Sequence, residues 1–348
     1  DRHAVEAIGL ELAVVDATGC VVTPGFVDPH EHLLGGSGEQ GFSTQTPMVL
    51  LSEIVPNGIT TVVGALGVDT TMKTMAGLLA RVKGLREEGL SAYCWSGGYN
   101  VPPTTVTGSI RNDMMFIEEV IGAGEIAIAD HRSVDPSAPE LARLVLDTHV
   151  GGILSRKAGV THFHTGGHDQ RLKRLRELLD GEYPVTPEML YPTHIERTEA
   201  LMDEAIALAA RGSHCDMDTV EGDLARWVTY WFDHGGHPDR LTVSSDTGAS
   251  SPAMLASEWR DCVLRHGLPL DRMLPLVTSN TATVLKLTQK GRVAPGADAD
   301  VLVLRRDSLD VVHVWARGRR MVDDGRLVQH EGWLETSRRR LDVTGQKH

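Results

Sequence analysis

The sequence has few cysteines and no long hydrophobic run. Its four cysteines lie far apart among 348 residues and form no C-x-x-C pair, which argues against a thiolate zinc site and a disulfide-stabilised fold. The first residues show no basic and apolar targeting sequence, so we expect a cytoplasmic location. No stretch approaches the roughly 20 apolar residues that a membrane-spanning helix needs, and no membrane partner is expected.

Positive charge is also scarce. The chain has 34 Lys and Arg against 47 Asp and Glu, for a net charge of -13 at pH 7. Because phosphate backbones bind clustered Lys and Arg, nucleic acid is not an expected partner. An anionic substrate remains compatible with this charge, since a pocket can be locally positive on an acidic protein.

Short runs rich in β-branched residues alternate with longer segments of helical period. The predicted strands are residues 59–63, 92–95, 126–129, 160–163, 189–194 and 241–245, and the predicted helices are residues 71–88, 111–122, 138–155, 170–181 and 198–211. Buried apolar strands that alternate with helices are typical of parallel sheets. The rhythm and the length predict an α/β fold, a (β/α)8 barrel of the TIM type.

The two ends of the chain differ from the middle. Residues 1–22 and 291–348 carry short alternating segments, including 301–304 and 311–315, with turn signals at Pro295-Gly296 and at 323–325. We therefore predict that both ends combine into a small β domain beside a barrel of residues 23–290.

The first candidate for chemistry is a His-x-His motif in residues 24–32 (PGFVDPHEH). Side chains two apart on a strand point the same way, so His30 and His32 can chelate one ion. Alone, the motif is weak, because the chain has 16 histidines and two surface histidines after a turn would look the same.

Other ligand types also stand at strand ends. His164, His194 and Asp246 each end a predicted strand, and in a barrel such ends converge on the face where active sites are built. His162 forms a second His-x-His with His164, so spacing alone leaves open which of the two is the ligand. Together these residues favour a metal centre.

These residues lie in a sequence that resembles the isoaspartyl dipeptidases of the amidohydrolase superfamily. The resemblance covers residues 20–326 and rests on six motifs: residues 24–32, GGSGE at 35–39, GYNVP at 98–102, DHRS at 130–133, PTHIER at 192–197 and SSD at 244–246. The run GRVAPGADADV at 291–301 is similar to the superfamily's return into its β domain.

The resemblance implies two divalent metal ions. His30, His32 and Asp246 would hold one, and His164 and His194 the other, which leaves His162 as a core histidine. The family bridges its ions with a carboxylated lysine, and the matching position here is Glu125. A glutamate keeps one bridging carboxylate, but it is shorter, so a site with a single ion remains the alternative.

The lysine that precedes His164 in the neighbourhood is Lys157, whose sequence setting indicates a solvated turn. Glu125 is therefore the favoured bridge. Mixed histidine and carboxylate ligation suits zinc.

The resemblance also implies the catalytic and substrate-binding residues. Asp246 would act as ligand and base, and Tyr99 would donate a hydrogen bond to the oxyanion when a metal-bridged hydroxide attacks the amide. Glu39 would receive the substrate ammonium. The remaining matches are the carboxylate clamps Arg132 and Arg197 and the hydrogen-bond donor Ser250.

The expected substrate is a small β-aspartyl dipeptide, and the family implies a homo-oligomer, with an octamer as one form. Two alternatives remain. An N-acyl-amino-acid deacylase or a cyclic amidase would share the metal site without the set of Glu39, Arg132 and Arg197. A non-catalytic scaffold on the same barrel would commonly lose ligands, whereas here only the lysine is replaced.

Overall fold

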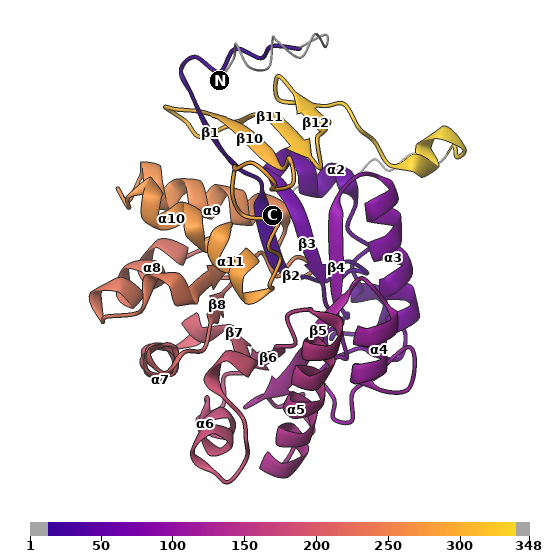
Figure 1. The fold of residues 1–348 in the computed structure, drawn as a ribbon, viewed down its shortest axis with the longest axis vertical. Helices are drawn as coiled ribbons and strands as arrows, with labels where there is room; N and C mark the ends of the chain where they lie inside the picture. Colours follow the sequence, from indigo (N-terminus) through magenta and orange to yellow (C-terminus); the bar gives the residue numbers. More distant parts are fainter. Residues whose placement is uncertain (1–12, 339–348) are drawn as a thin grey trace.

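A computed structural model describes residues 13–338, in which parallel strands curl at the centre, helices surround them and a small separate sheet lies at one end (Figure 1). The hydrophobic core fills the space between strands and helices. Every residue of the first six central strands is buried apart from Tyr93, as is typical of parallel strands that are covered on both faces. The predicted parallel α/β architecture is confirmed.

The central strands form two parallel sheets. Six strands pair in chain order: β2 (Phe26–Glu31), β3 (Ile59–Gly64), β4 (Ser91–Ser96), β5 (Val120–Ile128), β6 (Thr161–Thr165) and β7 (Leu190–Thr193). Two more, β8 (Cys215–Met217) and β9 (Leu241–Val243), pair with each other. A single bridge between Glu31 and Thr247 links the chain after β9 back to β2.

The predicted closed barrel is therefore only partly observed, because within residues 13–338 no backbone ladder joins β7 to β8. Side chains span this gap instead. The buried Asp216 of β8 accepts hydrogen bonds from Thr193 of β7 at 2.8 Å and from Ser244, just after β9, at 2.6 Å. Because β8 and β9 are only three residues long, they can form few backbone hydrogen bonds. The Asp216 carboxylate therefore helps to hold these strands together.

The helices follow the strands around the outside of the sheet. They are α2 (Leu51–Ile54), α3 (Met75–Glu87), α4 (Ile110–Phe116), α5 (Ala138–Ser155), α6 (Lys173–Asp180), α7 (Glu199–Arg211), α8 (Leu224–Asp233), α9 (Pro252–Leu264), α10 (Leu270–Leu276) and α11 (Ser279–Val284). Short 3-10 turns are η1 (Phe42–Thr44), η2 (Val55–Asn57), η3 (Pro187–Met189), η4 (Ile195–Arg197), η5 (Pro238–Arg240) and η6 (Gly332–Glu335).

Local sequence signals explain several helix ends. The helix α5 has the predicted bounds and starts at a capping box. In this motif the Glu140 carboxylate accepts a hydrogen bond from the backbone N–H of Ser137. The helix predicted at 111–122 is wrong at its end, since α4 stops at Phe116 and Val120 already begins β5. The apolar residues 120–122 are compatible with either a helix or a buried strand, and the sequence around them does not distinguish the two.

The small sheet is antiparallel and has the order β1, β10, β11, β12, β13. Its strands are β1 (Cys20–Pro24), β10 (Val301–Arg305), β11 (Val311–Ala316), β12 (Arg319–Asp323) and β13 (Arg326–Leu327). The predicted combination of both chain ends in a small β domain is thus confirmed. The predicted contributions of residues 1–12 and 339–348 lie outside the described residues.

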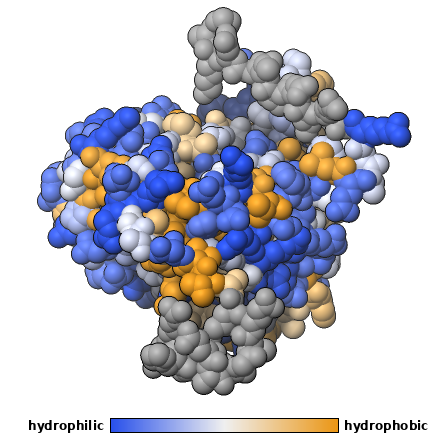
Figure 2. Space-filling view, turned by 90° about the horizontal axis from the view of Figure 1, so that it is seen from above, coloured by the Kyte–Doolittle hydropathy of each residue, from blue (hydrophilic) through white to orange (hydrophobic). Residues whose placement is uncertain are grey.

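Seen from the end that carries the small sheet, the surface is largely hydrophilic with separate hydrophobic patches (Figure 2). No helix of the described residues is long and apolar enough to cross a bilayer.

Candidate metal centre

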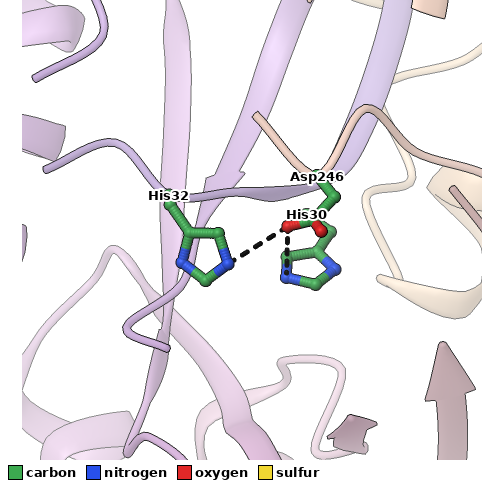
Figure 3. A group of neighbouring side chains, drawn as sticks. All are labelled: His30, His32 and Asp246. Carbon is green, nitrogen blue, oxygen red and sulfur yellow. Dashed lines mark ion pairs between the residues drawn. The ribbon is translucent and has the colours of Figure 1, made fainter. Parts of the chain in front are cut away.

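The His-x-His motif and Asp246 meet at the ends of two strands. His30 belongs to β2 and His32 follows it, while Asp246 follows β9 with a left-handed backbone (φ 47°). The Oδ1 atom of Asp246 lies 3.1 Å from His32 Nε2 and 3.6 Å from His30 Nε2 (Figure 3). This oxygen is buried and has no hydrogen-bond partner among the described residues, so the three donors face one another as ligands of a single ion would.

Glu125 of β5 lies between this group and the other histidines. It is fully buried, and its Oε2 atom is 2.8 Å from His30 Nε2 and 3.7 Å from His32 Nε2. Its Oε1 atom is 2.7 Å from His164 Nδ1 and 3.5 Å from His194 Nε2. Each carboxylate oxygen therefore faces one pair of histidines, which is the arrangement that a bridging ligand requires.

The electrostatics of the centre favour a cation. Burial alone would raise the pKa of Glu125, but the neighbouring histidines hold it well below its usual range. Burial would likewise lower the pKa of His30, yet the charges of Glu125 and Asp246 raise it to about 9. A site that attracts protons this strongly also attracts a divalent cation, and the donors are types that bind zinc. The residues present thus fit the metal centre that the sequence predicts.

Two further carboxylates orient the histidines of the second pair. Asp130 Oδ2 lies 2.9 Å from His164 Nε2, and Asp218 Oδ2 lies 2.5 Å from His194 Nδ1. Each carboxylate is placed to accept a hydrogen bond from the outer ring N–H, so that the inner nitrogen faces Glu125, an arrangement common behind metal-ligating histidines. The sequence prediction missed both roles.

The alternative ligands lie elsewhere. His162 is buried, stacks on Trp95 with ring centroids 5.1 Å apart, and lies 3.1 Å from the Tyr191 carbonyl. Lys157 is half-buried, and its Nζ donates to the carbonyls of Met114 and Ile117, so it is not the solvated turn residue that the sequence indicates. Among the described residues, the groups of His, Cys, Asp and Glu side chains that could hold an ion contain His30, His32, Glu125, His194 and Asp246, but neither His162 nor the predicted ligand His164.

A pocket of about 450 Å³ opens onto the candidate centre. Three of the four predicted substrate-binding residues line it, namely Glu39, Arg132 and Arg197, together with the predicted catalytic residues Tyr99 and Asp246. Ser250 is on the same turn as Asp246, to whose carbonyl its backbone donates at 3.0 Å, but it is not among the lining residues. Three acidic residues that the sequence prediction did not assign also line the pocket: Glu196, Asp218 and Glu221.

Within the pocket, Glu39 and Arg132 pair with each other, with Oε1 and Nη1 2.5 Å apart. Asp130 holds the guanidinium from the other side, with 2.8 Å contacts to Nε and Nη2. The Tyr99 hydroxyl is 2.8 Å from His164 Nδ1. Arg197 donates from Nε to the Thr165 carbonyl at 2.9 Å and has no ion pair within residues 13–338.

Two known structures of low sequence identity share the fold of this chain. An amidohydrolase from a Sargasso Sea environmental sample is 18% identical, with a TM-score of 0.59 over 91% of this chain and 85% of that chain. A D-hydantoinase is 17% identical, with a TM-score of 0.59 over 91% of this chain and 88% of that chain. These neighbours share the fold.

A more similar structure is the β-aspartyl dipeptidase of Fervidobacterium islandicum AW-1, which is 37% identical. Its structure without ligand has a TM-score of 0.88 over 93% of this chain and 89% of that chain. Its complex with β-Asp-Leu has a TM-score of 0.86 over 90% and 87%. The chain therefore belongs to the β-aspartyl dipeptidase family of the amidohydrolase superfamily.

Curated sequences give more distant matches. Adenine deaminase 2 of Rhizobium meliloti (strain 1021) is 25% identical over 91% of this chain and 51% of its own length, and adenine deaminase of Bacillus subtilis (strain 168) is 23% identical over 91% and 52%. The chain spans about half the length of the curated relatives it matches. No family model matches the sequence.

Proposed function

We propose that this chain hydrolyses the isopeptide bond of small β-aspartyl dipeptides with two divalent metal ions, for which zinc suits the donors. The observation that carries the proposal is that Glu39, Arg132 and Arg197 line the same pocket as four of the candidate metal ligands, His32, His164, His194 and Asp246. Bound metal ions would polarise the scissile carbonyl and activate water near neutral pH. The similar dipeptidase binds β-Asp-Leu, which supports this substrate class.

The pair of Glu39 and Arg132 explains how a zwitterion would be recognised. A free amino acid head group carries one ammonium and one carboxylate. Its ammonium can pair with Glu39 and its carboxylate with Arg132, and these two ion pairs would replace the one between Glu39 and Arg132. Asp130 keeps the Arg132 guanidinium in place while Glu39 is released. Arg197, without an ion pair among the described residues, is available for the second substrate carboxylate.

Two side chains would serve the reaction itself. Burial and the charge of Glu125 raise the pKa of Tyr99 well above 10, so its hydroxyl keeps its proton and can donate to an oxyanion. Asp246 would take up a proton from the attacking water and deliver it to the leaving amine. Both residues line the pocket.

The proposal is tested by assaying purified, metal-analysed protein against β-Asp-Leu, α-Asp-Leu, N-acetyl amino acids, dihydroorotate and adenine. Hydrolysis confined to β-Asp-Leu supports it. Turnover of an acetylated amino acid, of dihydroorotate or of adenine, but not of β-Asp-Leu, assigns another amidohydrolase activity, and no turnover at all supports a scaffold. Light scattering on the same sample tests the homo-oligomer that we also infer, an octamer being one form.

A substitution tests the substrate role of one residue. We expect Arg197→Met to lower kcat/KM for β-Asp-Leu at least tenfold, because roughly 1.4 kcal/mol of transition-state binding is a factor of ten, and to leave the metal content unchanged. Arg226→Met, at an exposed arginine outside the pocket, is the matched control. An unchanged kcat/KM for the Arg197 variant would exclude this role.

A further inference from the structure

A second hollow of about 770 Å³ lies away from the metal centre. It is formed by the end of α5 with the residues after it, and by α11 with the segment that leads toward β10. The residues after α5 precede β6, whereas the candidate metal ligands lie in the second halves of their strands or after them, so the two sites are at opposite ends of the parallel sheet. No residue of the described chain lines both hollows.

The lining of this hollow is strongly basic. It contains Arg156, Lys157, Lys286, Lys290 and Arg292, and none of the described Asp or Glu residues belongs to it. We name these five side chains the basic hollow. Such a concentration of positive charge is unexpected on a chain whose net charge is -13.

Four of the five charges have no carboxylate partner. Arg156, Lys286 and Arg292 are exposed and form no ion pair with any residue from 13 to 338. Lys157 forms no ion pair there either, but its Nζ donates to the carbonyl oxygens of Met114 at 2.6 Å and Ile117 at 2.5 Å, which lie outside the hollow, and the nearby Glu119 and Glu118 partly offset its charge. Only Lys290 is neutralised, by Asp298 and Asp300 at 2.8 and 2.6 Å.

Some arginines elsewhere on the surface do have carboxylate partners. Arg171 and Arg176 both pair with Glu204, and Arg86 pairs with Glu118. Like charges in one hollow repel one another unless an anion lies between them. A ligand with several negative charges would remove this repulsion, and arginine guanidinium groups suit phosphate oxygens in particular.

We propose that the basic hollow binds a small phosphate-type anion with several negative charges. The anion would connect Arg156, at the end of α5, with Lys286 and Arg292, on the segment that returns the chain to the small sheet. Because it would tie together parts of the barrel and the connection to the small sheet, its binding raises the Tm of the whole chain.

The test is calorimetric titration of the full, metal-loaded chain with inorganic pyrophosphate at low salt, followed by thermal unfolding. We expect saturable binding with one ion per chain, weaker at higher NaCl, and an increase in Tm. The double variant Arg156→Gln/Arg292→Gln should bind at least tenfold more weakly. Lys286→Gln, at an exposed position, should weaken binding as well without affecting the fold.

The matched control is Arg305→Gln/Arg326→Gln, which removes two exposed arginines outside the hollow and should bind pyrophosphate as the wild type does. Equal affinity in the wild type and in both hollow variants would overturn the proposal, since the anion would then bind elsewhere, the metal centre included. Binding of a short oligothymidylate but not of pyrophosphate would overturn it in favour of a nucleic-acid surface.

Discussion

At the scale of single residues, Glu125 is where this chain departs from the carboxylated lysine that the family resemblance implies. A glutamate side chain is shorter, yet its two oxygens lie 2.8 and 2.7 Å from His30 and His164. The two histidine pairs are thus close enough for the shorter side chain to reach both. A fixed carboxylate needs no covalent assembly from carbon dioxide.

We therefore expect the activity to be independent of dissolved carbon dioxide, and Glu125→Ala to lose metal and nearly all turnover. Without Glu125, two cations would face each other with no anion between them. Elemental analysis should find two divalent ions per wild-type chain and at most one in the variant. Glu182→Ala, at an exposed glutamate, is the control. An alanine variant that keeps both ions would show that Glu125 is not the bridge.

A second prediction concerns Asp218, whose carboxylate contacts the Nδ1 atom of His194 and orients its ring. We expect Asp218→Asn to weaken metal binding roughly 10- to 100-fold, since a neutral amide no longer fixes the tautomer or strengthens the basicity of the ring. Titration with a competing chelator measures this loss. The exposed Asp233→Asn is the control, and an affinity equal to that of the wild type would contradict the orienting role.

A buried histidine outside the metal centre, His214, makes the stability of the folded chain depend on pH. Burial and Arg240, whose Nη1 is 3.4 Å from Nδ1, lower the pKa of His214 to about 4. Between pH 6.5 and about 4 the unfolded chain takes up a proton that the folded chain does not, so this histidine makes stability fall as the pH is lowered. The difference corresponds to roughly 3 kcal/mol.

Urea unfolding of the wild type and of His214→Gln between pH 7 and 4 measures this contribution. The wild type should lose more stability than the variant over that range, while the exposed His266→Gln should behave as the wild type does. Parallel curves for the wild type and the His214 variant would rule out the contribution.

At the scale of elements, the sequence predicts strands where an apolar run is bounded by turns. This succeeds for β3 and β9, whose ends lead toward site residues such as Asp246. It fails for β8, because Cys215–Met217 is three residues long and its centre is a buried aspartate. Because β8 is not predicted, the sequence does not indicate that Asp218 lies at the end of a strand. Its position behind His194 therefore could not be predicted.

The aspartate missed in β8, Asp216, spans the gap in the backbone ladder between β7 and β8. Asp216 offers both oxygens to hydroxyl groups of β7, β9 and the residue after β9, including Thr242 at 2.5 Å. Which polar groups meet inside a core depends on the packing of distant segments, and no local pattern in the sequence shows it. The same holds for Asp130 and for the pairing of Glu39 with Arg132.

At the scale of the whole molecule, Lys290 joins the barrel to the small sheet. It is buried, and its Nζ donates to Ser91 of β4 at 2.5 Å and to Asp300, just before β10, at 2.6 Å. Asp300 also accepts from the backbone of Arg317, between β11 and β12, at 2.7 Å. One buried ion pair therefore contacts both the barrel sheet and the small sheet.

We expect Lys290→Met to destabilise the protein by roughly 3 to 5 kcal/mol, because it leaves Asp300 buried without its cation. Guanidinium unfolding measures the change, and Lys286→Met, four residues earlier and exposed, should have little effect. In Lys290→Met/Asp300→Asn the uncompensated charge is gone, so the double variant should lose less than the sum of the two single variants. Additive losses would mean that Lys290 and Asp300 stabilise the fold independently, and that the pair does not couple the barrel to the small sheet.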